Sequence, residues 1–357
     1  MTQFQKTQMK SASLVSSYNE WDPLEEVIVG RAENAQIAVQ DKSLYAVEYG
    51  DSGSIDRMPT GPYPAHVISE TQEQLEALVE MFQKNGVKVR RPDIYDHKKR
   101  FGSPDWQTDG QYNYCPRDLF IVQGDMIIES PMTLRARQYE TNSFKPILRE
   151  YMESGAKWFC APKPLLLDSD YFIEENRASA IADSDPIFDA ANVLRIGKDL
   201  LYLVSDSGNK IGARWLQAVL GDEYRVHAIE GLYTGTHVDT TITLVRAGLV
   251  VANAERVNPQ NLPEIFRKWD VIYLDDVHDI GFTGVPYASE WIGMNFMMLN
   301  PDTAVVDGKQ TKLIKELEAR KVNTIPMQLT HARTMGGGMH CVTLDVRRKG
   351  SLEDYCS

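Results

Sequence analysis

The residues of this chain best suited to chemistry are one cysteine, one histidine and a set of aspartates. Cys341 follows the glycine run 336–338 and His340, and it leads into a half-apolar stretch, 342–346, that is typical of a strand. Glycine allows positive φ angles and a close approach of the backbone to a ligand. We therefore interpret Cys341 as a nucleophile whose sulfur faces a cleft, rather than as a small thiol that fills space.

A candidate proton shuttle lies in the segment 236–239, where His237 and Asp239 are two residues apart. If this segment is extended, both side chains lie on one face. A histidine beside carboxylates stays protonated more readily, so it can act as a general acid and then as a general base near neutral pH. The sequence therefore predicts that His237 works together with the cysteine.

Three aspartates, Asp118, Asp189 and Asp239, each stand at or just before the first strand of a repeated unit. Carboxylates around a thiol would repel the oxyanion of amide hydrolysis, which disfavours a cysteine protease. A guanidinium fits better, because its planar N–H donors pair with carboxylates and its carbon accepts attack by a thiolate. A zinc site at His340 and Cys341 is disfavoured because adjacent ligands have unsuitable spacing.

The elements that must position these residues repeat along the chain. Each unit contains two strands joined by a tight turn, an amphipathic helix and a third strand. Clear copies begin at Asp118, Asp189, Asp239 and Trp291, and the third has its helical stripe at 262–269. A looser copy uses a strand at 27–30, a helix at 68–82, a strand at 87–89 and a closing strand at 341–346. Such repetition predicts a closed radial array of the α/β class, because closure removes exposed sheet edges.

Composition limits the class of protein. With 357 residues, 43% of them hydrophobic and 25% charged, we expect a soluble globular chain. The net charge of −12 disfavours a nucleic-acid partner, because phosphate-binding surfaces cluster Lys and Arg. No apolar run approaches the roughly 20 residues of a membrane span, so no membrane partner is expected. Four cysteines without a C-x-x-C pair indicate free thiols in a reducing, cytoplasmic setting.

The expected organisation is a disordered tail at 1–17 followed by a single catalytic domain at 18–357. The loops 31–64, 163–187 and 275–288 are expected to wall or cover the site, since compact domains seldom carry such long loops without a use. The sequence leaves a homodimer open.

Several motifs resemble those of the arginine-dependent amidinotransferases, and the likeness extends from Asn19 to the C-terminus. The motifs are Phe188-Asp189-Ala190-Ala191-Asn192, His237-Val238-Asp239, Cys115-Pro116-Arg117-Asp118, Gly336-Gly337-Gly338-Met339-His340-Cys341 and Leu344-Asp345-Val346-Arg347-Arg348. Within the family the chain looks closest to inosamine-phosphate amidinotransferases and is similar to the arginine:lysine enzyme of phytotoxin synthesis. The resemblance implies a five-bladed α/β propeller of pseudo-fivefold ββαβ modules, a pentein-like fold.

The resemblance also implies roles for the candidate residues. Cys341 corresponds to the family nucleophile, His237 to the acid/base group and Asp189 to its catalytic carboxylate partner. Asp118 and Asp239 correspond to the carboxylates that hold the guanidinium. We expect these aspartates to raise the pKa of the Cys341 thiol in the free enzyme, and a bound guanidinium to lower it.

Two further positions concern the substrates. Arg256 matches a family arginine that binds the α-carboxylate of the amino-acid substrate, and Ser289 matches a serine that contacts substrate. Members that use glycine as acceptor carry methionine at the position of Thr236 and serine at that of Ala288. The resemblance therefore implies an acceptor larger than glycine.

The expected activity is a ping-pong transfer of the amidino group of L-arginine, through an amidino-cysteine, to a primary amine with release of L-ornithine. L-Lysine and an inosamine phosphate are the candidate acceptors, in the biosynthesis of an antibiotic or toxin. This chemistry requires no metal or organic cofactor. Open alternatives are an arginine deiminase or hydrolase, which would release citrulline, and a non-catalytic protein that binds guanidino compounds.

Overall fold

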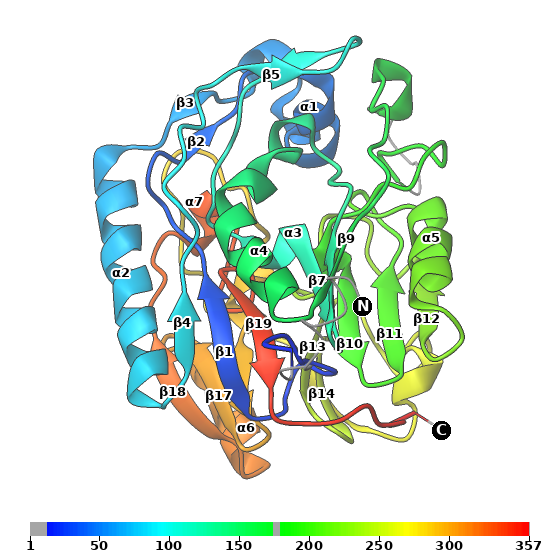
Figure 1. The fold of residues 1–357 in the computed structure, drawn as a ribbon. Coiled ribbons are helices and arrows are strands. Elements are labelled where there is room, and N and C mark those ends of the chain that lie inside the picture. The colour runs from blue at the N-terminus through cyan, green and yellow to red at the C-terminus, as the bar shows by residue number, and fades with distance from the viewer. Residues whose placement is uncertain (1–12, 174–178, 357) are drawn as a thin grey trace.

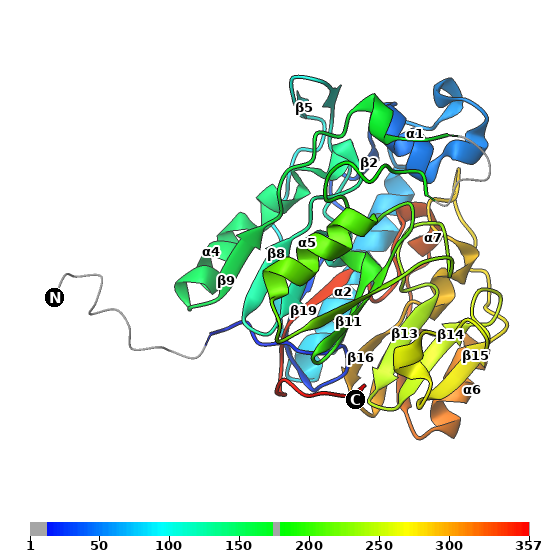
Figure 2. The same cartoon turned by 90° about the vertical axis from the view of Figure 1, so that its right-hand side faces the viewer.

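The computed structural model describes residues 13–173 and 179–356, and its fold is mixed α/β (Figures 1 and 2). Among these residues there are five three-stranded sheets and two small two-stranded ones. In each three-stranded sheet two strands pair antiparallel, and the third runs parallel to the middle strand. The predicted strand order of the repeated unit is confirmed.

Four of these sheets are continuous in sequence. Their elements are β7 (Phe120–Gln123), β8 (Met126–Glu129), α4 (Lys145–Glu153) and β9 (Lys157–Cys160); β10 (Val193–Ile196), β11 (Asp199–Leu203), α5 (Lys210–Leu220) and β12 (Arg225–Ile229); β13 (Ile242–Arg246), β14 (Leu249–Asn253), η8 (Glu264–Phe266) and β15 (Asp270–Leu274); and β16 (Met297–Asn300), β17 (Thr303–Asp307), α6 (Thr311–Ala319) and β18 (Asn323–Met327). The turn glycines Gly124, Gly197 and Gly248 have φ angles of 60°, 70° and 80°. Tight hairpins need such left-handed residues.

The fifth sheet joins the two ends of the chain. Strand β1 (Leu24–Val29) pairs antiparallel with β19 (Thr343–Arg348) and parallel with β4 (Lys88–Arg90), and α2 (Ala65–Lys84) connects β1 to β4. Figure 1 shows β1 and β19 side by side. The apolar core of this sheet is continuous with that of the sheet formed by β7, β8 and β9, because Ile28 and Leu344 pack in one cluster with Phe120 of β7.

Two expectations about local structure were wrong. The helix expected at 262–269 is reduced to the single turn η8, because Pro263 lies within the segment and proline cannot continue a helix. The predicted tail extends too far, because Val15 is buried and Ser16 pairs with Arg347. The first 12 residues of that tail lie outside the described part of the chain.

The long segment 31–64 forms a cover at one end of the molecule. Its main element is α1 (Lys42–Glu48), which Asp41 caps by accepting from two backbone N–H groups. The strands β2 (Gln36–Ile37) and β3 (Gly61–Pro62) and the single turns η2 (Gly50–Ser52) and η3 (Ile55–Arg57) complete it. In both views α1 lies at the upper end, above the short helix α7 (Ala332–Met335).

The remaining short elements connect the units or precede their strands. They are β5 (Phe101–Gly102), β6 (Gln107–Thr108), α3 (Pro116–Leu119), η4 (Arg135–Arg137), η5 (Glu140–Phe144), η6 (Asp168–Asp170), η7 (Ala190–Asn192) and η9 (Glu290–Met294). Within the described residues, every helix is too short or too polar to span a bilayer.

Candidate active site

Each of the five units places one polar residue or cysteine just before the strand that pairs antiparallel with its middle strand. Asp118 precedes β7, Asp189 precedes β10, Asp239 precedes β13, Asn295 precedes β16 and Cys341 precedes β19. All five side chains are buried. Repetition of the unit brings these equivalent positions together, and the contacts described below join them into one site. Asn295 was missed from the sequence, although its position in the fourth repeat could have revealed it.

The Cys341 thiol is held by two of these residues. It donates to Oδ2 of Asp239 at 3.4 Å and accepts from Nδ2 of Asn295 at 3.2 Å. Oδ1 of Asn295 also accepts from the backbone N–H of His340 at 2.9 Å and of Cys341 at 3.2 Å. The Asn295 amide therefore fixes both the sulfur and the backbone that carries it.

The pKa of Cys341 is raised well above the usual value of a thiol. A hydrogen bond with Cys115 is the main cause, followed by burial and by the charge of Asp239. The pKa of Cys341 is therefore shifted in the expected direction, but Cys115 contributes more to the shift than the aspartates do. The sequence singled out Cys115 only as part of a motif, and it carried no signal that the two thiols meet.

His237 is paired with two carboxylates. Its Nε2 lies 3.1 Å from Oδ2 of Asp189, and its Nδ1 lies 3.8 Å from Oδ1 of Asp118. Asp189 is itself oriented by Thr133, whose backbone N–H donates to Oδ1 at 2.8 Å. Burial alone would lower the pKa of His237, but Asp118 and Asp189 outweigh it and raise the pKa to about 9. The imidazole is therefore protonated at neutral pH.

The segment 236–239 is not extended, so the condition for His237 and Asp239 to share a face is not met. His237 has a φ angle of 64°, which is unusual for a residue other than glycine. His237 and Asp239 consequently meet different partners, and Oδ2 of Asp239 lies 2.9 Å from Nδ1 of His340. Backbone strain of this kind is found at functional sites when the surrounding structure maintains it.

Two carboxylates in the site each have one oxygen without a hydrogen bond. Oδ2 of Asp118 accepts from Nη1 of Arg137 at 2.7 Å, and Oδ2 of Asp239 is shared by His340 and Cys341. Within the described residues, Oδ1 of Asp118 and Oδ1 of Asp239 are buried and accept no hydrogen bond. Buried polar atoms are normally satisfied, so these two oxygens indicate where a ligand donates.

Arg256 and Ser289 are in direct contact. Nη2 of Arg256 donates to the Ser289 hydroxyl at 3.1 Å, and Nη1 donates to the carbonyl of Thr240 at 3.0 Å. The guanidinium stacks on the ring of Tyr233 with its central carbon 3.6 Å from the ring centroid. This arginine is therefore positioned by several contacts and is not a freely moving surface charge.

The glycine run 336–338 has a different task from the one expected. Only Gly336 has a positive φ angle, 84°. Protein side chains fill the space that a methyl group would need, at 2.2 Å from Tyr287 for Gly336, 2.4 Å from Cys115 for Gly337 and 2.7 Å from Asn295 for Gly338. The three glycines thus leave room for neighbouring side chains of the protein, among them Cys115 and Asn295.

A cluster of buried charged side chains lies next to the site. Its members are Glu20, Arg117, Arg195, Asp345 and Arg348. Asp345 accepts from Nη2 of Arg195 at 2.5 Å and from Nε of Arg348 at 2.6 Å, and it pairs with Arg117 at 2.6 Å. The cluster reaches the site through His340, whose Nε2 lies 3.3 Å from Glu20.

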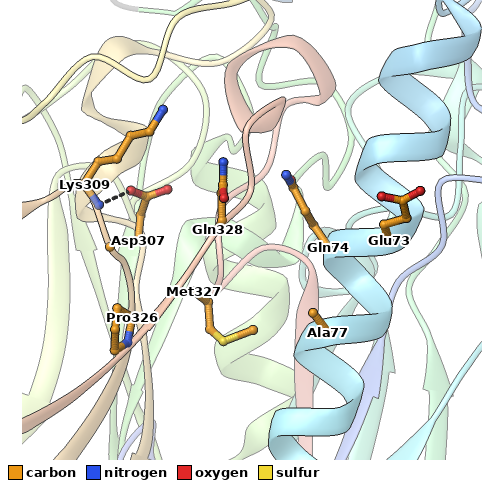
Figure 3. Close-up of a pocket in the computed structure, with 9 residues that line it drawn as sticks. Glu73, Gln74, Ala77, Asp307, Lys309, Pro326, Met327 and Gln328 are labelled. Carbon is orange, nitrogen blue, oxygen red and sulfur yellow. Dashed lines mark hydrogen bonds between the residues drawn. The ribbon is translucent and has the colours of Figure 1, made fainter.

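One surface pocket lies away from the candidate residues. A pocket of about 490 Å³ lies between α2 and the strands β17 and β18, lined by residues that include Gln74, Asp307 and Met327 (Figure 3). It contains none of the candidate residues. Among residues 13–173 and 179–356, no three His, Cys, Asp or Glu side chains are grouped so that they could hold a metal ion.

Comparison with known proteins places this site in a family, although no family model matches the chain. Inosamine-phosphate amidinotransferase 1 of Streptomyces glaucescens is 54% identical over 345 residues, which cover 96% of this chain and 99% of that protein. L-Arginine:L-lysine amidinotransferase of Pseudomonas savastanoi pv. phaseolicola is 36% identical over 357 residues, with coverage of 96% and 97%. The solved structure of inosamine-phosphate amidinotransferase StrB1 of Streptomyces griseus matches with a TM-score of 0.95 at 52% identity, covering 97% of this chain and 100% of that one. The chain belongs to the amidinotransferases and is a transferase.

Proposed function

We propose that this enzyme moves the amidino group of L-arginine to a primary amine larger than glycine and releases L-ornithine. The observation that carries the proposal is the pair of oxygens that accept no hydrogen bond within the described residues, Oδ1 of Asp118 and Oδ1 of Asp239. Both belong to carboxylates that contact His237 or Cys341. A planar guanidinium can donate to two carboxylates while its carbon faces the sulfur.

In the first half-reaction the bound cation lowers the pKa of Cys341, and the thiol loses its proton to solvent. The sulfur attacks the guanidino carbon. The bond from that carbon to the side-chain nitrogen breaks, and protonated His237 gives its proton to the departing ornithine amine. Asp189 keeps His237 oriented and protonated for this step. An amidino-cysteine and a neutral imidazole remain.

In the second half-reaction a neutral acceptor amine attacks the amidino carbon. His237 takes a proton from the attacking nitrogen, the carbon–sulfur bond breaks, and the Cys341 thiolate is restored. The residue that served as acid in the first step therefore serves as base in the second. We assign the α-carboxylate of the amino-acid substrate to Arg256 and Ser289, which touch one another beside the site.

An inosamine phosphate is the first candidate acceptor, and L-lysine is the second. The relative named for inosamine phosphate is 54% identical, whereas the one named for L-lysine is 36% identical. We also propose that the five similar sheets form the blades of a five-bladed α/β propeller within one catalytic domain. This arrangement accounts for the gathering of one site group from each unit.

The test is incubation with L-arginine alone, followed by intact-protein mass spectrometry and amino-acid analysis. One amidino group should add to the protein, on Cys341, with one equivalent of ornithine released. Cys341→Ser should form no adduct and show no turnover. Release of citrulline would instead identify a hydrolase, and preserved turnover in the serine variant would rule out the covalent route. A panel of amine acceptors then identifies the second substrate.

A further inference from the structure

Glu48 is an acidic side chain of the cover, the segment 31–64, and it has no role in the cycle above. It is the last residue of α1. Leu44 lies four residues earlier and so on the same face of the helix, and it is fully buried in one apolar cluster with Leu134 and Ala136. Glu48 therefore faces the body of the protein from the cover, and its side chain is partly buried.

The charged groups around Glu48 belong to the site. His237, Asp189, Arg137 and Asp118 all act on its carboxylate. Burial, reinforced by the two aspartates, raises the pKa of Glu48 to about 8. Geometry agrees, because α1 packs against η4, whose Arg137 donates to Asp118.

Glu48 also lies close enough to act on the far end of the site. Its charge and that of Arg256 both influence Tyr233, and the Arg256 guanidinium stacks directly on the Tyr233 ring. The carboxylate is therefore within electrostatic reach of both the His237 end, where the guanidino carbon reacts, and the Arg256 end, where the α-carboxylate is assigned. A donor amino acid has to span the same two ends.

The carboxylate of Glu48 has no partner of its own in the protein. It makes no hydrogen bond or ion pair with any residue in the ranges 13–173 and 179–356. By contrast, Asp189 accepts from Thr133 and contacts His237. A partly buried carboxyl near other acids takes up a proton unless a cation pairs with it. His237 and Arg137 act on Glu48 without a hydrogen bond, and a cationic group of the ligand supplies a direct partner.

We propose that Glu48 binds the α-ammonium group of the L-arginine donor. This inference rests on the proposed function, which assigns partners to the guanidinium and to the α-carboxylate of L-arginine but none to its second cationic group. With Glu48 included, the donor is held at three points, and the cover helix α1 takes part in recognising an α-amino acid. Glu48 is then a specificity-determining residue for the first half-reaction.

The test compares Glu48→Gln with the wild type on two donors, L-arginine and 5-guanidinopentanoate, which lacks only the α-amino group. Adduct formation is measured in single turnovers without acceptor, so that the acceptor cannot contribute. A hydrogen bond between charged groups predicts a rise in the donor concentration for half-maximal rate of about 10- to 100-fold with L-arginine. The limiting rate should change little. The wild type should already need a high concentration of 5-guanidinopentanoate for its half-maximal rate. Glu48→Gln should not raise that concentration further.

Asp51→Asn is the matched control, because Asp51 is exposed on the same cover and lies three residues further along the chain. It should behave as wild type on both donors, and thermal unfolding checks that both variants are folded. Equal losses on the two donors, or a loss confined to the limiting rate, would overturn the inference and point to an effect on His237. A loss seen only after an acceptor is added would also overturn it and move Glu48 to the acceptor. Failure of the wild type to form any adduct would count against the proposed function instead.

Discussion

Replacing Asp189 with asparagine should lower the pKa of His237 without changing the shape of the site. In the wild type that pKa is raised from an ordinary value of 6.5 to about 9, which corresponds to about 3.4 kcal/mol in favour of the imidazolium. Asp189 contributes a hydrogen bond to a charged group at 3.1 Å. Such a bond is worth about 1.5–3 kcal/mol, so Asp189→Asn should bring the pKa down to about 7 to 8.

The measurement is a pH titration by NMR of protein labelled with ¹⁵N-histidine. The chain has seven histidines, and His237→Gln assigns the relevant signal. His97 is an internal control, because its burial lowers its pKa to about 4 and it makes no contact with Asp189. The His97 titration should be the same in the wild type and in the variant.

The same substitution should change how stability depends on pH. A group whose pKa is raised in the folded state stabilises the protein fully below its unfolded value, and this stabilisation is lost as pH rises through the folded value. For wild-type His237 the loss therefore falls between pH 6.5 and about 9. In Asp189→Asn this loss of stability should be smaller and complete at a lower pH. The measurement is the free energy of unfolding in urea as a function of pH. An unchanged His237 midpoint would refute the view that Asp189 keeps the imidazole protonated.

Two further substitutions test the surroundings of the nucleophile. Asp345→Asn leaves three buried arginines short of a counter-charge, so the free energy of unfolding in urea should fall by about 3–5 kcal/mol; Asp302→Asn, which removes an exposed ion pair, should cost about 1 kcal/mol or less. Cys115→Ala removes the main cause of the raised pKa of Cys341, so the pH midpoint for alkylation of Cys341 by iodoacetamide should move down. An unmoved or higher midpoint would show that Cys115 does not control this thiol.

The gathering of Cys341, Asp118, Asp189 and Asp239 could be predicted from the sequence because it follows from repetition. Residues at equivalent positions of repeated units come to equivalent places, whatever the details of each unit. Asn295 obeys the same rule, being placed just before β16. It was missed because an asparagine is neither a nucleophile nor an ionisable group, and its contact with the Cys341 thiol is visible only in the structure.

Three other residues could not be predicted as part of the site from periodicity, because they lie in segments without it. Arg137 lies in the short turn η4, Glu48 lies in the cover, and Cys115 precedes α3. Hydrophobic patterns predict which residues are buried in helices and strands, but they say nothing about where irregular segments place a charge. The prediction of a helix at 262–269 was wrong for a related reason. The apolar residues there have helical spacing, but Pro263 prevents a longer helix.

The pairing of β1 with β19 also governs how this enzyme is made. The sheet that contains β19, the strand after Cys341, combines strands that are far apart in the chain, so its contacts are among those with the greatest sequence separation in the fold. Contacts of that kind close slowly, because the entropy of a very long loop must be lost first. During translation β1 emerges early and keeps one edge unpaired until β19 leaves the ribosome, and an unpaired edge invites association with other chains. Pairing of that edge and placement of the Cys341 sulfur are therefore the same event, and both wait until β19 has been made.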